Sequence, residues 1–113
     1  MKIKISSLSK NEDFKSIITG RKINNKYLTI FFKKLSDKND KKLNISFVAK
    51  KKIGNAVKRN KIKRRLRNIM NDAIKKIKLN FQYSYLLIAK KNVLEDEYEN
   101  IKKTLFIDFE KIK

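Results

Sequence analysis

The stretch that follows Gly54 carries apolar residues at the spacing of an α-helix. Asn55 is a favourable N-cap, and the pattern predicts a helix that runs to about Leu79. The apolar stripe of this helix consists of Ile62, Leu66, Ile69, Met70, Ala73, Ile74 and Ile77. A stripe of this length has to be covered by other elements, so the chain needs a sheet or further helices to pack against it.

The same helix begins within a strongly basic segment. Residues 50–67 read KKKIGNAVKRNKIKRRLR, in which ten of 18 residues are Lys or Arg and none is acidic. Four of the five arginines of the chain lie in this segment: Arg59, Arg64, Arg65 and Arg67. On a helix, Asn60, Arg64 and Arg67 point away from the apolar stripe. An ordinary solvated face would mix Glu with these cations, so the pattern favours a surface that binds phosphates.

The rest of the chain predicts a small α+β fold around one sheet. A capping box at Ser9–Glu12 predicts a short first helix, with Gly20 in its C′ position. In chain order we expect a helix (10–19), two or three strands (22–33, with Ile23 in a short edge piece, and 43–49), the basic helix (55–79), a strand (83–89) and a helix (95–112). This order fits one domain over residues 1–113, with helices on one face of the sheet and part of the other face open.

Two sets of side chains alternate along residues 27–32. The first set is purely apolar and is predicted to face the core: Leu28, Ile30 and Phe32. The second set is mixed and suits a partly open face: Tyr27, Thr29 and Phe31. Packing within the sheet explains the two aromatic rings of the second set equally well. Residues 83–89, YSYLLIA, are almost all apolar, which is typical of a strand in the interior of a sheet.

The overall charge predicts a polyanionic partner. The chain has 113 residues and a net charge of +20, which attracts nucleic acid first and an anionic membrane surface second. The lysines outside residues 50–67 are explained equally well by the general abundance of Lys, Asn and Ile. No apolar run is long enough to span a membrane, and the first residues lack the apolar core of a signal peptide. We therefore expect a cytoplasmic protein.

The composition also limits the chemistry of the protein. The chain has no Cys and no His, which excludes disulfides and thiolate metal sites and removes the commonest general base. A catalytic group would have to be a carboxylate, a Lys or a Tyr. The acidic residues concentrate in residues 95–99, where the start of a helix explains them. We expect no catalytic and no metal-binding residue on this chain.

The motif in the basic segment resembles the signature of the bacterial ribonuclease P protein subunit. It stands here as Gly54, Asn55, Ala56, Val57, Arg59, Asn60, Lys61, Lys63, Arg64 and Arg67. The order of elements resembles that family over essentially the whole chain. The resemblance implies a four-stranded sheet in α-β-β-β-α-β-α order, with the basic helix in a left-handed βαβ crossover. Lys61 departs from the Arg that is frequent in the family, and the first helix has only one aromatic residue, Phe14.

This resemblance implies a subunit of a ribonucleoprotein enzyme. In the family, a large RNA is the catalyst, and the holoenzyme removes the 5′ leader of precursor tRNA by endonucleolytic cleavage. The protein binds the catalytic RNA and the leader, while Mg²⁺ is expected mainly on the RNA. No obligatory protein partner is evident.

The resemblance assigns roles to individual residues. Those expected to meet catalytic RNA are Arg59, Asn60, Lys61, Lys63, Arg64 and Arg67. Those expected to support this surface are Lys51, Lys52 and Asn55, together with Lys90 and Lys91 after the last strand. Those expected to contact the leader, in a cleft between the sheet and the first helix, are Phe14, Tyr27 and Phe31.

Three other functions share part of this pattern. A ribosomal or other structural RNA-binding protein would have a similar charge and size but would not need the ordered motif. A DNA-binding basic helix of the zipper type needs heptads, which the stripe after residue 62 does not follow. A nuclease made of protein alone lacks suitable catalytic groups.

Overall fold

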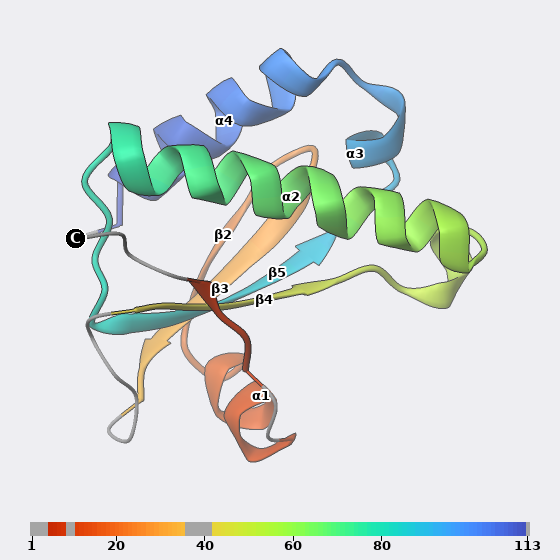
Figure 1. Cartoon of the computed structure of the whole chain (residues 1–113). Helices are drawn as coiled ribbons and strands as arrows, with labels where there is room; N and C mark the ends of the chain where they lie inside the picture. Colours follow the sequence, from red (N-terminus) through yellow and green to blue (C-terminus); the bar gives the residue numbers. More distant parts are fainter. Residues whose placement is uncertain (1–4, 9–10, 36–41, 113) are drawn as a thin grey trace.

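The computed structural model describes residues 5–8, 11–35 and 42–112, and these form one mixed sheet with helices on both faces (Figure 1). The elements are, in chain order, β1 (Ile5–Ser6), α1 (Asn11–Ile17), β2 (Arg21–Asn24), β3 (Leu28–Lys34), β4 (Leu43–Val48), the 3₁₀ turn η1 (Lys51–Ile53), α2 (Ala56–Lys76), β5 (Tyr83–Ala89), α3 (Asn92–Glu95) and α4 (Tyr98–Glu110). No helix in these described ranges is long and apolar enough to cross a membrane.

The sheet has the strand order β1-β4-β5-β3-β2. β5 is the central strand, antiparallel to β3 and parallel to β4, with Leu87 opposite Ile30 and Tyr85 opposite Ile45. Its apolar sequence therefore has neighbours on both sides, as predicted for an interior strand. α2 connects the two parallel strands β4 and β5, which confirms the βαβ unit. The left hand of this crossover stays a prediction of the resemblance.

The sequence prediction did not include three short elements: β1, η1 and α3. The sheet has five strands rather than four, because Ile5 and Ser6 pair in parallel with Leu43 and Asn44. A strand of two residues is too short to show any alternation. The last helix was predicted to begin at residue 95, but Glu95 is the last residue of the separate helix α3. Asp96 has extended backbone angles, and α4 begins only at Tyr98.

The main core lies between the sheet and the pair α2 and α4. The sheet contributes Leu28, Ile30 and Phe32 from β3, which confirms their predicted facing. α2 contributes five fully buried residues of the predicted stripe: Ile62, Leu66, Ile69, Met70 and Ala73. The two helices are also joined at the surface, where the Lys102 ammonium lies 2.8 Å from the Asp72 carboxylate.

α1 covers part of the opposite face of the sheet, so the expectation that all helices share one face is wrong (Figure 1). A second, smaller cluster forms there, in which Ile17 of α1 and Leu86 of β5 are buried together with Leu8. The half-buried side chains around it are Phe14, Phe31, Leu35, Val48 and Ile88. We call this side the α1 face of the sheet, and its half-buried part extends beyond α1 toward the ends of β4 and β5.

Gly20 is required by close packing rather than by its dihedral angles. Gly20 does not have the left-handed φ that is common for a glycine in the C′ position. The amide of Gly20 donates to the Ile17 carbonyl over 2.9 Å and ends α1. A Cβ atom on Gly20 would lie 2.7 Å from the Phe32 carbonyl oxygen, so a side chain would push α1 away from β3. The Ser9 part of the predicted capping box lies outside the described residues.

Candidate nucleic-acid interface

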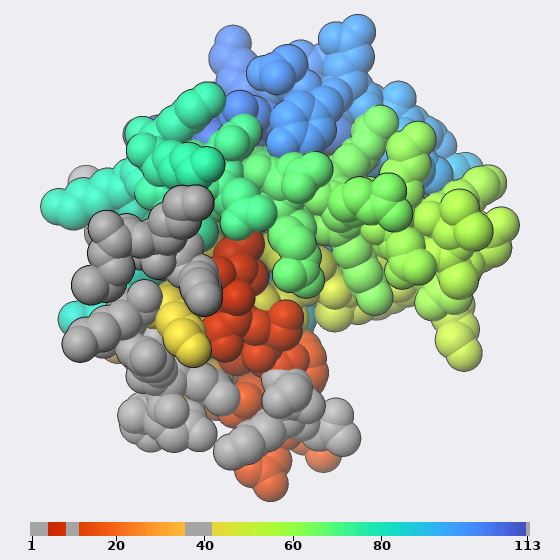
Figure 2. Space-filling model, in the orientation of Figure 1, coloured from red at the N-terminus to blue at the C-terminus, as the bar shows by residue number. Residues whose placement is uncertain are grey.

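The first turns of α2 present the predicted cationic surface. Asn55 caps the helix as predicted, because its Oδ1 accepts a hydrogen bond from the Lys58 amide over 3.0 Å. Five polar or charged motif side chains are exposed on the helix that follows: Asn60, Lys61, Lys63, Arg64 and Arg67. We call these five residues the basic face of α2. In Figure 2, side chains of α2 (green) cover much of this side of the molecule and continue into the segment before it (yellow-green).

Most cations of this surface are available to a partner. Arg64, Lys61 and Lys63 make no hydrogen bond or ion pair with any residue that the structure describes. The Arg67 guanidinium lies 5.8 Å from the centre of the Phe47 ring, which directs it toward the edge of β4. Arg59 is half-buried, and its Nε is a buried donor without a described partner. The predicted facing of the helix is confirmed, while RNA binding by these residues stays a prediction.

Four lysines surround a hollow at the end of the sheet. Lys50 and Lys52 follow β4, and Lys90 and Lys91 follow β5. The hollow has a volume of about 470 Å³, and its other lining residues are Thr29, Ile53, Ile88 and Ala89. We call it the lysine pocket. Lys51 is exposed on η1 but does not line it. Because β4 and β5 are parallel neighbours, their carboxyl ends meet at one edge, and this signal could have revealed the pocket from the sequence.

The Lys90 ammonium is already held by the protein. It donates to the Asn24 side-chain oxygen over 2.7 Å and to the Asn25 carbonyl over 2.6 Å. Asn24 is the last residue of β2, and Asn25 lies in the turn between β2 and β3. An ammonium has three donors, and both acceptors are neutral oxygens, so one donor of Lys90 is left for a phosphate.

The three aromatic residues predicted for the leader do not come together. Phe14 and Phe31 are half-buried on the α1 face. Tyr27 is 1% exposed and packs in the main core, where its hydroxyl donates to Asp96 Oδ2 over 2.5 Å and burial raises its pKa. The prediction that Tyr27 shares an open face with Thr29 and Phe31 is therefore wrong. Tyr27 precedes β3, which begins at Leu28, so the alternation of the strand does not extend to it.

Arg65 has a role that the sequence did not reveal. Its Nη1 donates to the carbonyl oxygens of Val93, over 3.0 Å, and Asp96, over 3.2 Å. The Asp96 carboxylate accepts from the Tyr27 hydroxyl and from the Glu97 amide, and these hydrogen bonds hold its pKa well below the usual range. One of the four clustered arginines is thus engaged inside the protein.

Comparison with known proteins identifies the family of this chain. The family model described as Ribonuclease P matches residues 3–113. The chain belongs to the ribonuclease P protein family. The ribonuclease P protein component of Bacillus pumilus is 35% identical over 103 residues, covering 90% of this chain and 83% of that protein. The protein component of Fusobacterium nucleatum is 37% identical over 109 residues, covering 89% and 91%.

Solved ribonuclease P proteins have the same fold. The protein from Thermotoga maritima superposes with a TM-score of 0.79 at 23% identity, covering 96% of this chain and 98% of its own. The protein from Staphylococcus aureus has a TM-score of 0.75 at 25% identity, covering 94% and 93%. Membership of the ribonuclease P family implies a role in tRNA 5′ processing and association with ribonuclease P RNA.

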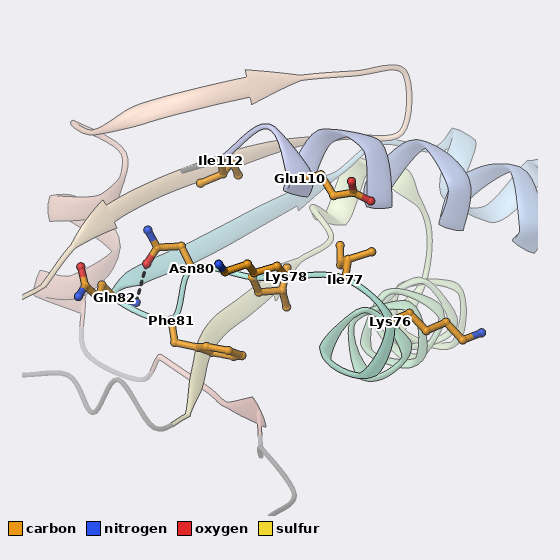
Figure 3. A pocket seen from close by; sticks show the side chains of 9 residues that line it. Lys76, Ile77, Lys78, Asn80, Phe81, Gln82, Glu110 and Ile112 are labelled. Atoms are coloured by element: carbon orange, nitrogen blue, oxygen red, sulfur yellow. Dashed lines mark hydrogen bonds between the residues drawn. The ribbon is translucent and has the colours of Figure 1, made fainter.

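A larger hollow lies at the other end of α2, away from the motif of the ribonuclease P family. It has a volume of about 850 Å³ and lies between the end of α2, residues 77–82 and the end of α4 (Figure 3). Its wall includes Phe81 and Ile112, and the side chain of Asn80 accepts from the Gln82 amide over 2.9 Å. Two lysines and Glu110 give it mixed charge. None of the residues predicted to bind RNA lines this hollow.

The described residues contain no cluster of side chains suited to bind a metal ion. They contain no group of three or more acidic side chains placed to hold an ion. The acidic residues near the interface serve the fold, as Asp96 does for Tyr27 and the start of α4. The candidate interface combines exposed cations with a partly apolar sheet face, and this combination is suited to binding a polyanion.

Proposed function

We propose that this protein is the protein subunit of ribonuclease P, which binds the catalytic RNA and the 5′ leader of precursor tRNA and promotes removal of the leader. The observation that carries this proposal is the meeting of two cationic sets at one edge of the sheet. The basic face of α2 supplies exposed donors on a rigid helix, and the lysine pocket lies directly before that helix. Closely spaced cations on a rigid helix suit the phosphates of a folded RNA.

The α1 face offers a path for a single strand. Thr29 and Ile88 are directly paired across β3 and β5, and Val48 lies next to Ile88 on β4. These half-buried side chains connect the lysine pocket with Phe31 and with Phe14 of α1. Unpaired nucleotides bind such surfaces by stacking on rings and apolar side chains while cations hold the phosphates. We assign the leader to this path and omit Tyr27 from it.

The chemistry of cleavage is assigned to the RNA. Hydrolysis of a phosphodiester at neutral pH requires an activated water and stabilisation of the developing charge, which RNA-bound Mg²⁺ supplies. The protein contributes binding energy and lowers the electrostatic repulsion between the catalytic RNA and its RNA substrate, because it carries a charge of +20. Precursor tRNA is a cytoplasmic substrate in bacteria, so we expect the protein there.

The deciding experiment measures cleavage of a precursor tRNA by the cognate catalytic RNA at low Mg²⁺, with and without the protein. We expect cleavage at the mature 5′ end that depends on the protein. No stimulation, together with tight binding to unrelated RNAs, would instead indicate a general RNA-binding or ribosomal protein. Cleavage by the protein without the RNA would contradict the assignment of the chemistry.

A further inference from the structure

We propose that Arg65 is a positioning residue: it holds the segment that carries Lys90 and Lys91 beside the basic face of α2 and does not itself contact RNA. This inference rests on the proposed function, in which both cationic sets bind the same RNA assembly. It separates Arg65 from its neighbour Arg64, although the two side chains are equal in chemistry and adjacent in the motif segment.

The surroundings of the two arginines differ in the way this proposal requires. Arg64 is exposed and has no hydrogen-bond partner in the described part of the chain. Arg65 is half-buried and directs one nitrogen, Nη1, to two backbone carbonyl oxygens at 3.0 and 3.2 Å. A helix turns by about 100° per residue, so adjacent residues face different sides. Arg65 faces α3, and Arg64 faces solvent.

α3 depends on such a contact because it has only four residues, Asn92–Glu95. A single helical turn is unstable alone, and its last carbonyl groups have no partner within the helix. Arg65 donates to the carbonyl of Val93, inside this turn, and to that of Asp96, directly after it. A cation at the C-terminal end of a helix is also favourable for the helix dipole. Arg65 therefore stabilises α3 from the neighbouring helix.

The two lysines are built into the start of the same turn. The Val93 amide donates to the Lys90 carbonyl over 3.2 Å, and the Leu94 amide donates to the Lys91 carbonyl over 2.9 Å. The Lys91 ammonium lies 3.5 Å from Glu95, at the end of the turn. Loss of α3 would therefore release the backbone and the side chain of Lys91 together.

The segment is held from its other side by the turn between β2 and β3. The Lys90 amide donates to the Tyr27 carbonyl over 2.7 Å, and the Asn92 side chain donates to the Lys26 carbonyl over 2.9 Å. These contacts join the segment to the sheet but not to α2. Val93 of α3 is also buried in the main core. The hydrogen bonds from Arg65 add a directional contact between the segment and α2, and we infer that this contact fixes the spacing between the lysines and the basic face.

The test compares Arg65→Met with Arg64→Met, each alone and combined with Lys91→Gln. Dissociation constants are measured for the cognate ribonuclease P RNA as a function of salt, and hydrogen exchange is measured for the amides of Leu94 and Asp96. We expect Arg64→Met to weaken binding by about five- to tenfold, to lower the salt slope by about one and to leave the exchange unchanged. We expect Arg65→Met to weaken binding by about threefold or more, with faster exchange of both amides.

The combination with Lys91→Gln distinguishes positioning from a general loss of stability. If Arg65 acts through Lys91, Arg65→Met should weaken binding by less than about twofold once Lys91 is replaced, whereas the effect of Arg64→Met should persist in full. If Arg65→Met is unfolded at the assay temperature, Arg65→Lys takes its place in the same cycle, because Lys keeps a donor and the charge.

Three results would overturn the proposal. One is that the losses of RNA affinity caused by Arg65→Met and by Lys91→Gln add in full when the two substitutions are combined. Another is a fall in the salt slope on Arg65→Met without faster exchange, which would make Arg65 a direct RNA contact. The third is an unchanged affinity for RNA on both Lys91→Gln and Lys90→Gln, which would leave no RNA contact in the segment for Arg65 to position. In each case a loss of RNA affinity on Arg64→Met would still support the proposed function. Failure of the role assigned to Arg65 is therefore distinguishable from failure of the proposed function.

Discussion

The role of a basic side chain in this protein depends on whether its donors already have acceptors. Lys102 lies 2.8 Å from Asp72, and this partner raises the pKa of Lys102. Lys90 donates to two neutral oxygens, and Arg65 does the same through one nitrogen. Arg64 has no described partner. A phosphate can satisfy Arg64 without displacing any contact of the protein, and so we expect the largest loss of affinity there.

Replacement of Arg64 by Ala tests this expectation. We expect RNA affinity to fall by about tenfold, the equivalent of ~1.4 kcal/mol, because one charge-assisted contact is lost. The melting temperature should not change, since the side chain is exposed and has no hydrogen-bond partner in the described part of the chain. Titration with the cognate RNA measures the affinity, and thermal unfolding measures the melting temperature. Lys103→Ala is the control, because it removes an exposed charge from α4. Equal losses in both variants, or unfolding of Arg64→Ala, would contradict the facing of α2.

Asp96 predicts a specific dependence of stability on pH. Hydrogen bonds from Tyr27 and Glu97 keep its pKa below the ordinary value when the protein is folded. An acid with a lowered pKa stabilises the fold at neutral pH, and this contribution disappears as the pH falls below about 4. In urea unfolding, the free energies of unfolding of the wild type and of Asp96→Asn should therefore differ most at pH 7 and become similar in acid.

Tyr27→Phe is the matched variant for this experiment, because it removes the hydroxyl that contributes most to the shift. It should lower the free energy of unfolding at pH 7 and weaken the acid dependence. The difference in the free energy of unfolding between wild type and Asp96→Asn could also stay constant from pH 7 to pH 3. That result would show that the charge of the carboxylate does not stabilise the fold.

At the scale of elements, the long and periodic ones were predictable. α2 has apolar residues along its buried side and an N-cap at Asn55, and β5 is apolar except for Ser84. β1 and α3 contain two and four residues, too few for a period to appear. Their formation depends on distant partners, since β1 needs β4 and α3 is contacted by Arg65.

Only one part of the candidate interface could be predicted from local sequence. The basic face of α2 follows from helical geometry alone and was predicted correctly. The burial of Tyr27 depends on Asp96, which lies 69 residues later in the chain. The hydrogen bonds of Lys90 depend on Asn24, which lies 66 residues earlier. No local pattern encodes such pairs, so their roles became visible only in the folded chain.

The two glycines give a paired prediction for the elements that they join. Gly20→Ala should destabilise the protein by about 1–3 kcal/mol, because its Cβ would meet the backbone of β3. Gly54→Ala should change stability by less than about 0.5 kcal/mol, since its Cβ would meet only the flexible side chain of Lys58. Denaturant unfolding of both variants measures the difference. Equal effects would show that the approach of α1 to β3 is not tight.

For the whole molecule, the net charge of +20 predicts binding that is highly sensitive to salt. With roughly six phosphate contacts, affinity for the catalytic RNA should fall by on the order of a thousandfold between 50 and 200 mM salt, because binding releases counterions. A filter-binding titration over this range gives the slope. A flat response would show that the interface is held by contacts other than those to phosphate.

The central position of β5 has a consequence for the order in which the protein can fold during its synthesis. β3 and β4 do not pair with each other, and each is joined to the sheet's interior through β5. The ribosome makes residues 50–67 well before residues 83–89. Until β5 emerges, α2 has no complete sheet to pack against, and its basic segment belongs to an unfolded nascent chain. The RNA-binding surface therefore comes into existence late, when nearly the whole chain has been translated.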